Sequence, residues 1–176
     1  RERQIVRGGA DAVRRAQGGH RQDEQLRAPD AGGERGGGIR AAGHAAGAHG
    51  VIIPKNRSVS LNSVVAKVST GAVEYTPVAR VTNIAQTIEK LKKEGLWICG
   101  TALEASEDYF DADLTGALAI VIGSEGEGIS RIVRENCDFL VKIPMKGQTE
   151  SLNASVAAGI LLYESLRQRN AANKKG

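Results

Sequence analysis

The chain has 176 residues, of which 41% are hydrophobic and 25% are charged. It contains no apolar run approaching the ~18 residues of a membrane span, so we expect a soluble protein with no membrane partner. Its formal net charge of +4 is too small to indicate a nucleic-acid partner by itself. Its two cysteines, Cys99 and Cys137, lack CxxC spacing, which favours buried thiols in the reducing cytoplasm over a disulfide.

Composition divides the chain into two unlike parts. Residues 1–50 contain nine arginines, no lysine, 12 of the 22 glycines and only five residues from the set Val, Ile, Leu, Met and aromatics. Such a segment cannot bury enough apolar surface to offset the entropy of ordering it. Two interpretations remain open, a basic tail and GC-rich coding DNA translated out of frame. We therefore expect a degenerate or disordered segment at 1–46, a folded domain at 47–170 and a polar tail at 171–176.

From residue 51 onward, the apolar pattern predicts alternating strands and helices. Pro54 ends the first strand, Thr82 or Asn83 can cap the second helix, and Gly95 ends that helix. In chain order, the predicted elements are a strand at 51–53, a helix at 58–69, a strand at 74–81, a helix at 84–94, strands at 96–102 and 118–122, a helix at 129–136, a strand at 139–143 and a helix at 152–169.

The apolar runs at 96–102 and 118–122 are continuous rather than alternating. Continuous runs are typical of strands covered on both faces, so we predict an α/β fold, a parallel sheet with helices on both faces. Between these strands, the acidic stretch 106–115 is predicted to be a surface excursion with Tyr109 and Phe110 folded back. In the last helix, the residues available for burial are Val156, Ile160, Leu161 and Tyr163.

A glycine-rich turn follows one predicted strand, at Ile122-Gly-Ser-Glu-Gly-Glu-Gly128. Three glycines in six residues let the main chain turn sharply and approach a ligand closely, although a tight connection alone would also explain them. The turn is neither a GxGxxG motif nor a P-loop, and Glu125 and Glu127 would repel phosphates. A ligand with a cationic centre and no phosphate therefore suits it better.

A second polar loop runs from Ile143 to Ser155, between a strand end and an apolar helix. Its Ser151, Asn153 and Ser155 crowd the start of the helix, where such residues commonly act as N-caps. Alone, this loop predicts helix capping more readily than ligand binding.

Together, the two segments carry a specific resemblance. IVIGSEGEGISRIV and IPMKGQTESLNASVAAGILLYE resemble the second and third signature motifs of the SpoU (TrmH-like) branch of the SPOUT RNA methyltransferases. The resemblance extends upstream through GVIIPKNRS and covers residues 50 to about 169. It looks closest to the subgroup that methylates the 2′-hydroxyl of a guanosine in 23S ribosomal RNA.

The resemblance implies a C-terminal deep trefoil knot, a rare exception to unknotted topology. It also implies a homodimer, an RNA substrate and S-adenosylmethionine bound among the knot loops, with no metal. The three histidines have no metal-ligand spacing. The residues that match cofactor contacts of the family are Thr101, Ala102, Gly123, Gly128, Ile143, Met145 and Leu152.

The implied reaction is attack of the ribose 2′-oxygen on the sulfonium methyl, accelerated mainly by alignment. Some group must accept the hydroxyl proton or stabilise the alkoxide, and Glu125 and Asn153 match two residues of the family that help. The resemblance also implies an arginine in an N-x-G-x-x-x-R-T-A motif. We assign phosphate anchoring and charge stabilisation to it, because an arginine side chain stays protonated in proteins and is a poor general base. Arg40 is its only possible counterpart, but it lies one residue too far from Gly47 and the expected asparagine is missing.

RNA contacts are expected at a loop that follows the first strand, on the side where α/β sheets bind ligands. The predicted RNA-binding residues are Lys55, Asn56, Arg57 and Arg131, the last of which is equally explained as an exposed helical arginine. Three alternatives remain: an inactive cofactor- or RNA-binding knot domain because the first motif is broken, a tRNA ribose methyltransferase, and an unrelated nucleotide-binding enzyme with affinity for ATP or NAD.

Overall fold

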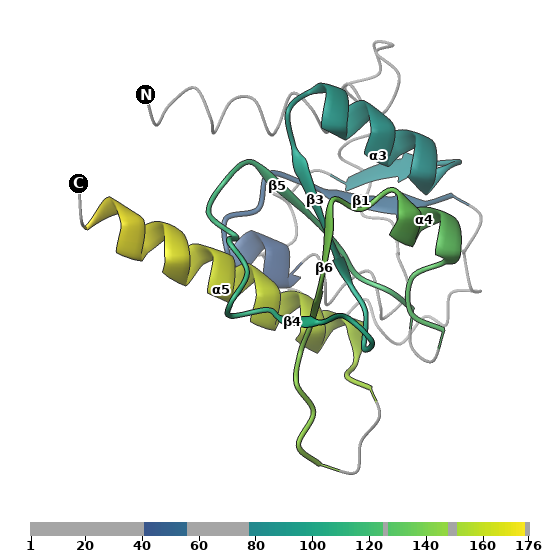
Figure 1. Cartoon of the computed structure of the whole chain (residues 1–176). Helices are drawn as coiled ribbons and strands as arrows, with labels where there is room; N and C mark the ends of the chain where they lie inside the picture. The colour runs from purple at the N-terminus through teal and green to yellow at the C-terminus, as the bar shows by residue number, and fades with distance from the viewer. Residues whose placement is uncertain (1–40, 56–77, 125–126, 148–150, 175–176) are drawn as a thin grey trace, which may run out of the picture.

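A computed structural model describes residues 41–55, 78–124, 127–147 and 151–174 (Figure 1). Residues 41–45 are helical and precede the first strand. The elements that follow are β1 (Val51–Pro54), β2 (Val78–Val81), α3 (Ile84–Lys93), β3 (Trp97–Thr101), β4 (Glu107–Asp108), β5 (Leu118–Val121), α4 (Arg131–Glu135), β6 (Phe139–Lys142) and α5 (Ala154–Asn173). The helix predicted at 58–69 and the first residues of the strand predicted at 74–81 lie outside the described residues.

The strands form a two-stranded sheet, β1-β2, and a four-stranded sheet with the order β4-β6-β3-β5. Every pairing between these strands is parallel. One of the two inner strands of the larger sheet is β3, in which Cys99 lies opposite Ile120 of β5 and Phe139 of β6. The predicted α/β class with a parallel sheet is therefore confirmed.

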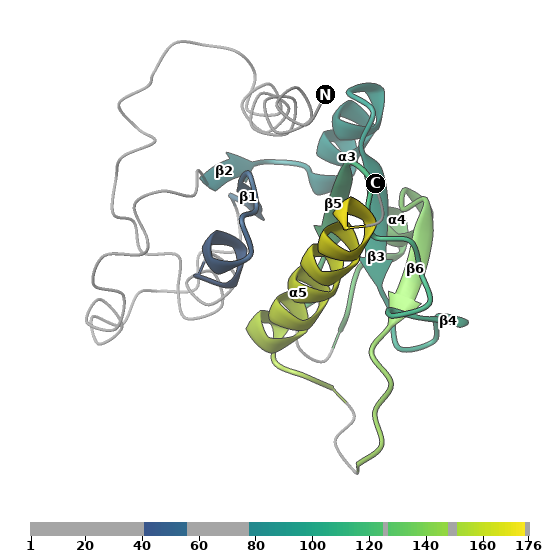
Figure 2. The same cartoon turned by 90° about the vertical axis from the view of Figure 1, so that its left-hand side faces the viewer.

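The two faces of the larger sheet are covered by different helices. Ile98 points to one face, where it packs with Ile88 and Leu91 of α3. Cys99, the next residue of β3, points to the opposite face, where it packs in a cluster with Leu161 of α5. Figure 2 shows α5 running along its side of the sheet. Burial on both faces explains why the strand sequences are continuously apolar.

Helix α3 has the N-cap and the terminating glycine that the sequence predicted. The Asn83 side chain accepts a hydrogen bond from Gln86 N at 3.1 Å, and Gly95 follows the helix with a φ of +86°. Asp138 then ties this helix to the sheet, because it pairs with Lys92 at 2.7 Å and accepts from Ile98 N at 2.8 Å. Burial alone would raise the pKa of Asp138, but the hydrogen bonds from Lys92 and Ile98 outweigh it and hold the pKa below its usual value.

The stretch predicted to be a surface excursion is more ordered than expected. It contains β4, which pairs in parallel with β6 and places Glu107 opposite Val141. It also buries Leu114 completely. Tyr109 packs against the cluster on the α5 face, as predicted, but the expectation for Phe110 is wrong, since this side chain is 47% exposed. Two acidic residues at a sheet edge carry no apolar period, so the pattern could not predict this strand.

The last helix is bonded to the segment that connects β4 to β5. Gln168 donates to Ala112 O at 3.0 Å and accepts from Leu114 N at 2.8 Å, and Ser165 donates to Leu114 O at 2.7 Å. The helix runs on to Asn173, beyond the predicted end at residue 169. None of the helices described by the structure is long and apolar enough to cross a membrane.

The predicted burial of α5 is only partly correct. Leu161 is completely buried, whereas Val156 and Tyr163 are 50% and 52% exposed. Both cysteines are free, as expected. Cys99 faces α5, while the Cys137 sulfur lies close to Gly100 on the other face, where it would contact an added Cβ. Burial raises the pKa of the Cys99 thiol to about 12, so the group stays protonated in the folded chain.

Candidate functional site

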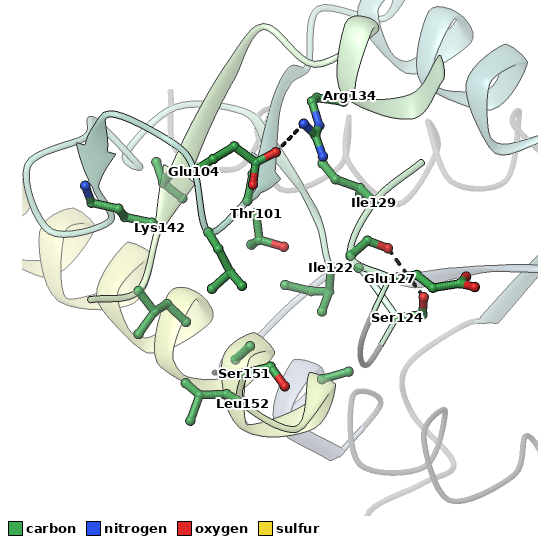
Figure 3. A pocket seen from close by; sticks show the side chains of 18 of the residues that line it. Thr101, Glu104, Ile122, Ser124, Glu127, Ile129, Arg134, Lys142, Ser151 and Leu152 are labelled. Carbon is green, nitrogen blue, oxygen red and sulfur yellow. Dashed lines mark hydrogen bonds and ion pairs between the residues drawn. The ribbon is translucent and has the colours of Figure 1, made fainter. Parts of the chain in front are cut away.

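A cavity of about 270 Å³ opens at the carboxyl ends of β3, β5 and β6, next to the start of α5 (Figure 3). This is the edge at which parallel α/β sheets bind ligands. Its lining residues come from the segments that follow the three strands, from α4 and from α5. They are Thr101, Ala102, Leu103, Glu104, Ile122, Gly123, Ser124, Glu127, Gly128, Ile129, Arg134, Val141, Lys142, Ile143, Met145, Ser151, Leu152, Ala154 and Ala157.

The end of β3 forms the floor of the cavity. The Thr101 hydroxyl donates to Val121 O of the neighbouring strand β5 at 3.1 Å. The Ala102 N–H donates to Val141 O of β6, on the other side, at 3.0 Å. These two bonds hold the chain in register with both neighbours as it leaves the sheet. The floor is therefore rigid where the strand ends.

The glycine turn forms one wall. Ser124 N donates to Gly128 O at 3.0 Å and Gly128 N donates to Ser124 O at 2.9 Å, which closes the turn on itself. Gly128 has a φ of +67°, a conformation that favours glycine. At Gly123, an added Cβ would lie only 2.4 Å from the carbonyl carbon of Gly128. Both glycines are therefore required by the turn itself: Gly123 makes room for the Gly128 backbone, and Gly128 adopts the left-handed conformation with open space where a Cβ would stand.

The polar loop before α5 forms the opposite wall. The Asn153 side chain accepts a hydrogen bond from Ser155 N at 2.8 Å and caps α5. This is the helix-capping role that the sequence predicted for the start of α5. Leu152 and Ile143 supply apolar surface, and Ser151 supplies a hydroxyl group. Figure 3 shows Ser151 and Leu152 across the cavity from Thr101 and Ile129.

Charged side chains of both signs border the cavity. Arg134 of α4 forms an ion pair with Glu104, which follows β3 (Figure 3). Lys142 lies 3.8 Å from the Asp108 carboxylate, and Glu127 lies in the glycine turn. The positive charges therefore have carboxylate neighbours, so the described lining offers no concentrated site for phosphate.

The structure brings all the predicted cofactor residues together. All seven of them, Thr101, Ala102, Gly123, Gly128, Ile143, Met145 and Leu152, line the cavity. Asn153 lies beside it, between the lining residues Leu152 and Ala154. Glu125, Arg40, Asn56 and Arg57 lie outside the described residues.

The other two predicted RNA-binding residues lie on the surface. Lys55 follows β1 and its backbone N–H donates to Val81 O at 2.8 Å. Arg131 is exposed on α4 and pairs with Glu135 at 2.7 Å. The sequence analysis missed Glu104 and Arg134 at the cavity. No local pattern marks them, because they meet only when the loop after β3 folds against α4.

Comparison with known sequences identifies relatives over most of the chain. The family model described as "SpoU rRNA Methylase family" matches residues 33–163. YacO of Bacillus subtilis, named for the TrmH family of tRNA/rRNA methyltransferases, is 56% identical over 134 residues, which are 76% of this chain and 54% of that protein. The 23S rRNA (guanosine-2′-O-)-methyltransferase RlmB of Ralstonia nicotianae is 53% identical over 131 residues, 74% of this chain and 53% of that protein. The chain thus spans about half the length of the curated relatives it matches.

Solved structures agree with these relatives. The SpoU methyltransferase AviRb from Streptomyces viridochromogenes, also solved in complex with the cofactor AdoMet, superposes with a TM-score of 0.69 at 33% identity, covering 77% of this chain and 55% of AviRb. The AdoMet-bound rRNA methyltransferase from Sinorhizobium meliloti gives a TM-score of 0.64 at 28% identity, covering 74% of this chain and 50% of that chain. The matched family model, the close relatives and the shared fold agree, and the chain belongs to the SpoU rRNA methylase family.

Proposed function

We propose that the chain is the catalytic domain of an S-adenosylmethionine-dependent RNA 2′-O-ribose methyltransferase, acting on a guanosine of 23S rRNA. The observation that carries this proposal is the cavity itself, where the glycine turn and the loop before α5 meet at the end of the sheet. The two motifs of the resemblance form the two walls of one cavity. The finer target rests on the name of the RlmB relative.

The cavity residues fit S-adenosylmethionine, which carries an adenosyl group, a positive sulfonium and no phosphate. Ile143 and Leu152 offer apolar surface for a flat ring, and the open space where a Cβ would stand at Gly128 lets a ligand approach the backbone closely. Glu127 adds a carboxylate to the lining, while Glu104 and Arg134 are paired with each other. A nucleoside triphosphate would bring several negative charges to a lining that has no spare cationic cluster in its described part.

When bound, S-adenosylmethionine supplies an electrophilic methyl group for the ribose 2′-oxygen. This chain must align that oxygen and receive its proton or stabilise the developing alkoxide. We assign this help to Asn153 and Glu125, and phosphate anchoring to Arg40. The cap bond to Ser155 N fixes Asn153 at the start of a long helix, so an amide there is held on a rigid element.

We assign the RNA contacts to Lys55, Asn56, Arg57 and Arg131, of which Lys55 and Arg131 are exposed in the described part of the chain. Methylation of separate rRNA and tRNA pools by the chain distinguishes the two RNA classes. We expect transfer to 23S rRNA, and transfer to tRNA alone would contradict the finer assignment. We further assign the chain to the cytoplasm, where ribosomal RNA is modified.

We also propose the deep trefoil knot and the homodimer that the resemblance implies. Membership of the SpoU family supports the knot. The bonds from Gln168 and Ser165 to residues 112–114 hold α5 against the connection from β4 to β5. The half-exposed Val156 and Tyr163 support the homodimer. They lie two turns apart on α5, so a second copy could cover both. Sedimentation at twice the chain mass is the expected result, and sedimentation as a monomer at all accessible concentrations would contradict the dimer.

Calorimetry with S-adenosylhomocysteine tests the proposed function most directly, because binding of this product does not require the first motif. We expect saturable binding of S-adenosylhomocysteine and no binding of ATP or NAD. Binding of ATP without S-adenosylhomocysteine would overturn the proposal and favour an unrelated nucleotide-binding enzyme.

A second candidate, a knot domain that binds without turnover, is favoured by the position of Arg40 and the absence of the motif asparagine. It predicts binding of S-adenosylhomocysteine without methyl transfer. Restoring an asparagine and an arginine at the family spacing should then recover activity. No gain in a folded variant that still binds the product would refute the broken motif as the cause.

A further inference from the structure

An ion pair between Glu104 and Arg134 joins two segments that border the cavity. Glu104 lies in the loop after β3, and Arg134 lies in α4, the helix that follows the glycine turn. Both side chains line the cavity, and Figure 3 shows their ion pair at its edge. Among the described residues, no other ion pair joins this loop to α4.

The pair holds α4 at a second point. At its base, α4 follows Ile129, which is buried and lies close enough to Gly100 of β3 to contact an added Cβ at 3.0 Å. At the rim, Arg134 reaches back to the loop after the same strand. The Arg134 Nε atom is buried and has no hydrogen-bond partner within the described part of the chain. The recorded polar contact that orients the guanidinium is therefore the one with Glu104.

The ion pair between Glu104 and Arg134 contributes little to the stability of the fold. The side chains of Glu104 and Arg134 are 57% and 39% exposed, and ion pairs in contact with water contribute little to folding. Their position is more informative, because the two segments they join adjoin predicted cofactor residues. Ala102 lies in the loop that carries Glu104, and Gly128 lies in the turn that leads into α4. A cavity whose walls are fixed beforehand loses less conformational freedom when a ligand binds.

We propose that Glu104 and Arg134 are positioning residues whose ion pair fixes the loop after β3 against α4 and so sets the width of the cavity for a nucleoside ligand. The pair acts on the ligand through the wall that it holds. This inference rests on the proposed function, because the probe is the product of the proposed reaction.

The test is calorimetric titration of S-adenosylhomocysteine into the wild-type chain and four variants. Glu104→Gln and Arg134→Gln should each weaken binding by about tenfold. The doubly reversed variant, Glu104→Arg with Arg134→Glu, should restore affinity to within about threefold of wild type, because it keeps the pair with its charges exchanged. Glu135→Gln is the matched control, since it removes an ion pair of the same helix away from the cavity and should leave affinity unchanged.

Thermal unfolding without ligand provides the fold control, and the midpoints of all variants should stay within a few degrees of wild type. Wild-type affinity in both single variants would overturn the inference. Loss of affinity that charge reversal does not recover would also overturn it, because one of the residues would then contact the ligand directly. If the wild-type chain itself does not bind S-adenosylhomocysteine, the proposed function falls together with the inference.

Discussion

Replacement of Gly123 by alanine should force the glycine turn open. The new Cβ would lie 2.4 Å from the Gly128 carbonyl carbon, 2.6 Å from Gly128 Cα and 2.7 Å from Ile129 N. These are all backbone atoms, so no side chain can rotate away. The Gly128 backbone must retreat by about 0.6 Å before the shortest contact reaches 3.0 Å. This movement opposes the two hydrogen bonds between Ser124 and Gly128, at 3.0 and 2.9 Å.

Overpacking of this kind lowers the free energy of unfolding by about 1–3 kcal/mol. Since Gly123 lines the cavity, we also expect affinity for S-adenosylhomocysteine to fall by about tenfold or more. Urea unfolding measures the first effect and calorimetry the second. Gly116→Ala is the matched control, because an added Cβ there meets no atom within 4 Å. A Gly123→Ala protein with wild-type stability and affinity would refute this account of the turn.

Three further predictions concern α5 and the buried thiol. Leu161→Ala should lower the free energy of unfolding in urea by about 2–5 kcal/mol, because this side chain is completely buried, and a loss well below that range would contradict its place in the cluster. Gly159→Ala should raise the same quantity by about 0.5–1 kcal/mol for the monomer in dilute solution, since the Cβ enters open space beside the helix; because Gly159 lies between Val156 and Tyr163, a decrease that grows with protein concentration would indicate that the proposed second copy covers this site. Burial raises the pKa of Cys99 from 9.0 to about 12, so its contribution to stability is complete below pH 9 and is lost as the pH rises towards 12. Urea titrations on both sides of pH 9 should show a shallower pH dependence in Cys99→Ala, and an identical slope would argue against the thiol.

The sheet and α3 were predictable from the sequence because their signals are local. The strands at 97–101 and 118–121 are continuously apolar, and α3 has a cap at Asn83 and a glycine after its end. In contrast, β4 is two acidic residues at a sheet edge, where pairing with β6 and not side-chain pattern determines the structure.

Long-range geometry explains what could not be predicted at the site. The Glu104–Arg134 ion pair joins residues that are remote in sequence, so no motif spacing predicts it. The spacing of apolar residues in α5 also did not predict which of them pack against the sheet. Leu161 does, whereas Val156 and Tyr163 point elsewhere, because this helix carries apolar residues on more than one side. The seven predicted cofactor residues came from motif resemblance, and the fold gathers them at one cavity.

The position of α5 in the chain has a consequence for biosynthesis. Leu161 of α5 packs in a cluster with Cys99 and Val141. Both of these residues leave the ribosome before α5 does. Until α5 emerges, one face of the nascent sheet is covered only in part, by residues such as Leu114, and the cavity lacks a wall. Incomplete chains that stop before residue 154 should therefore depend on chaperones or aggregate. Translation must reach the final helix before the protein can protect its own interior.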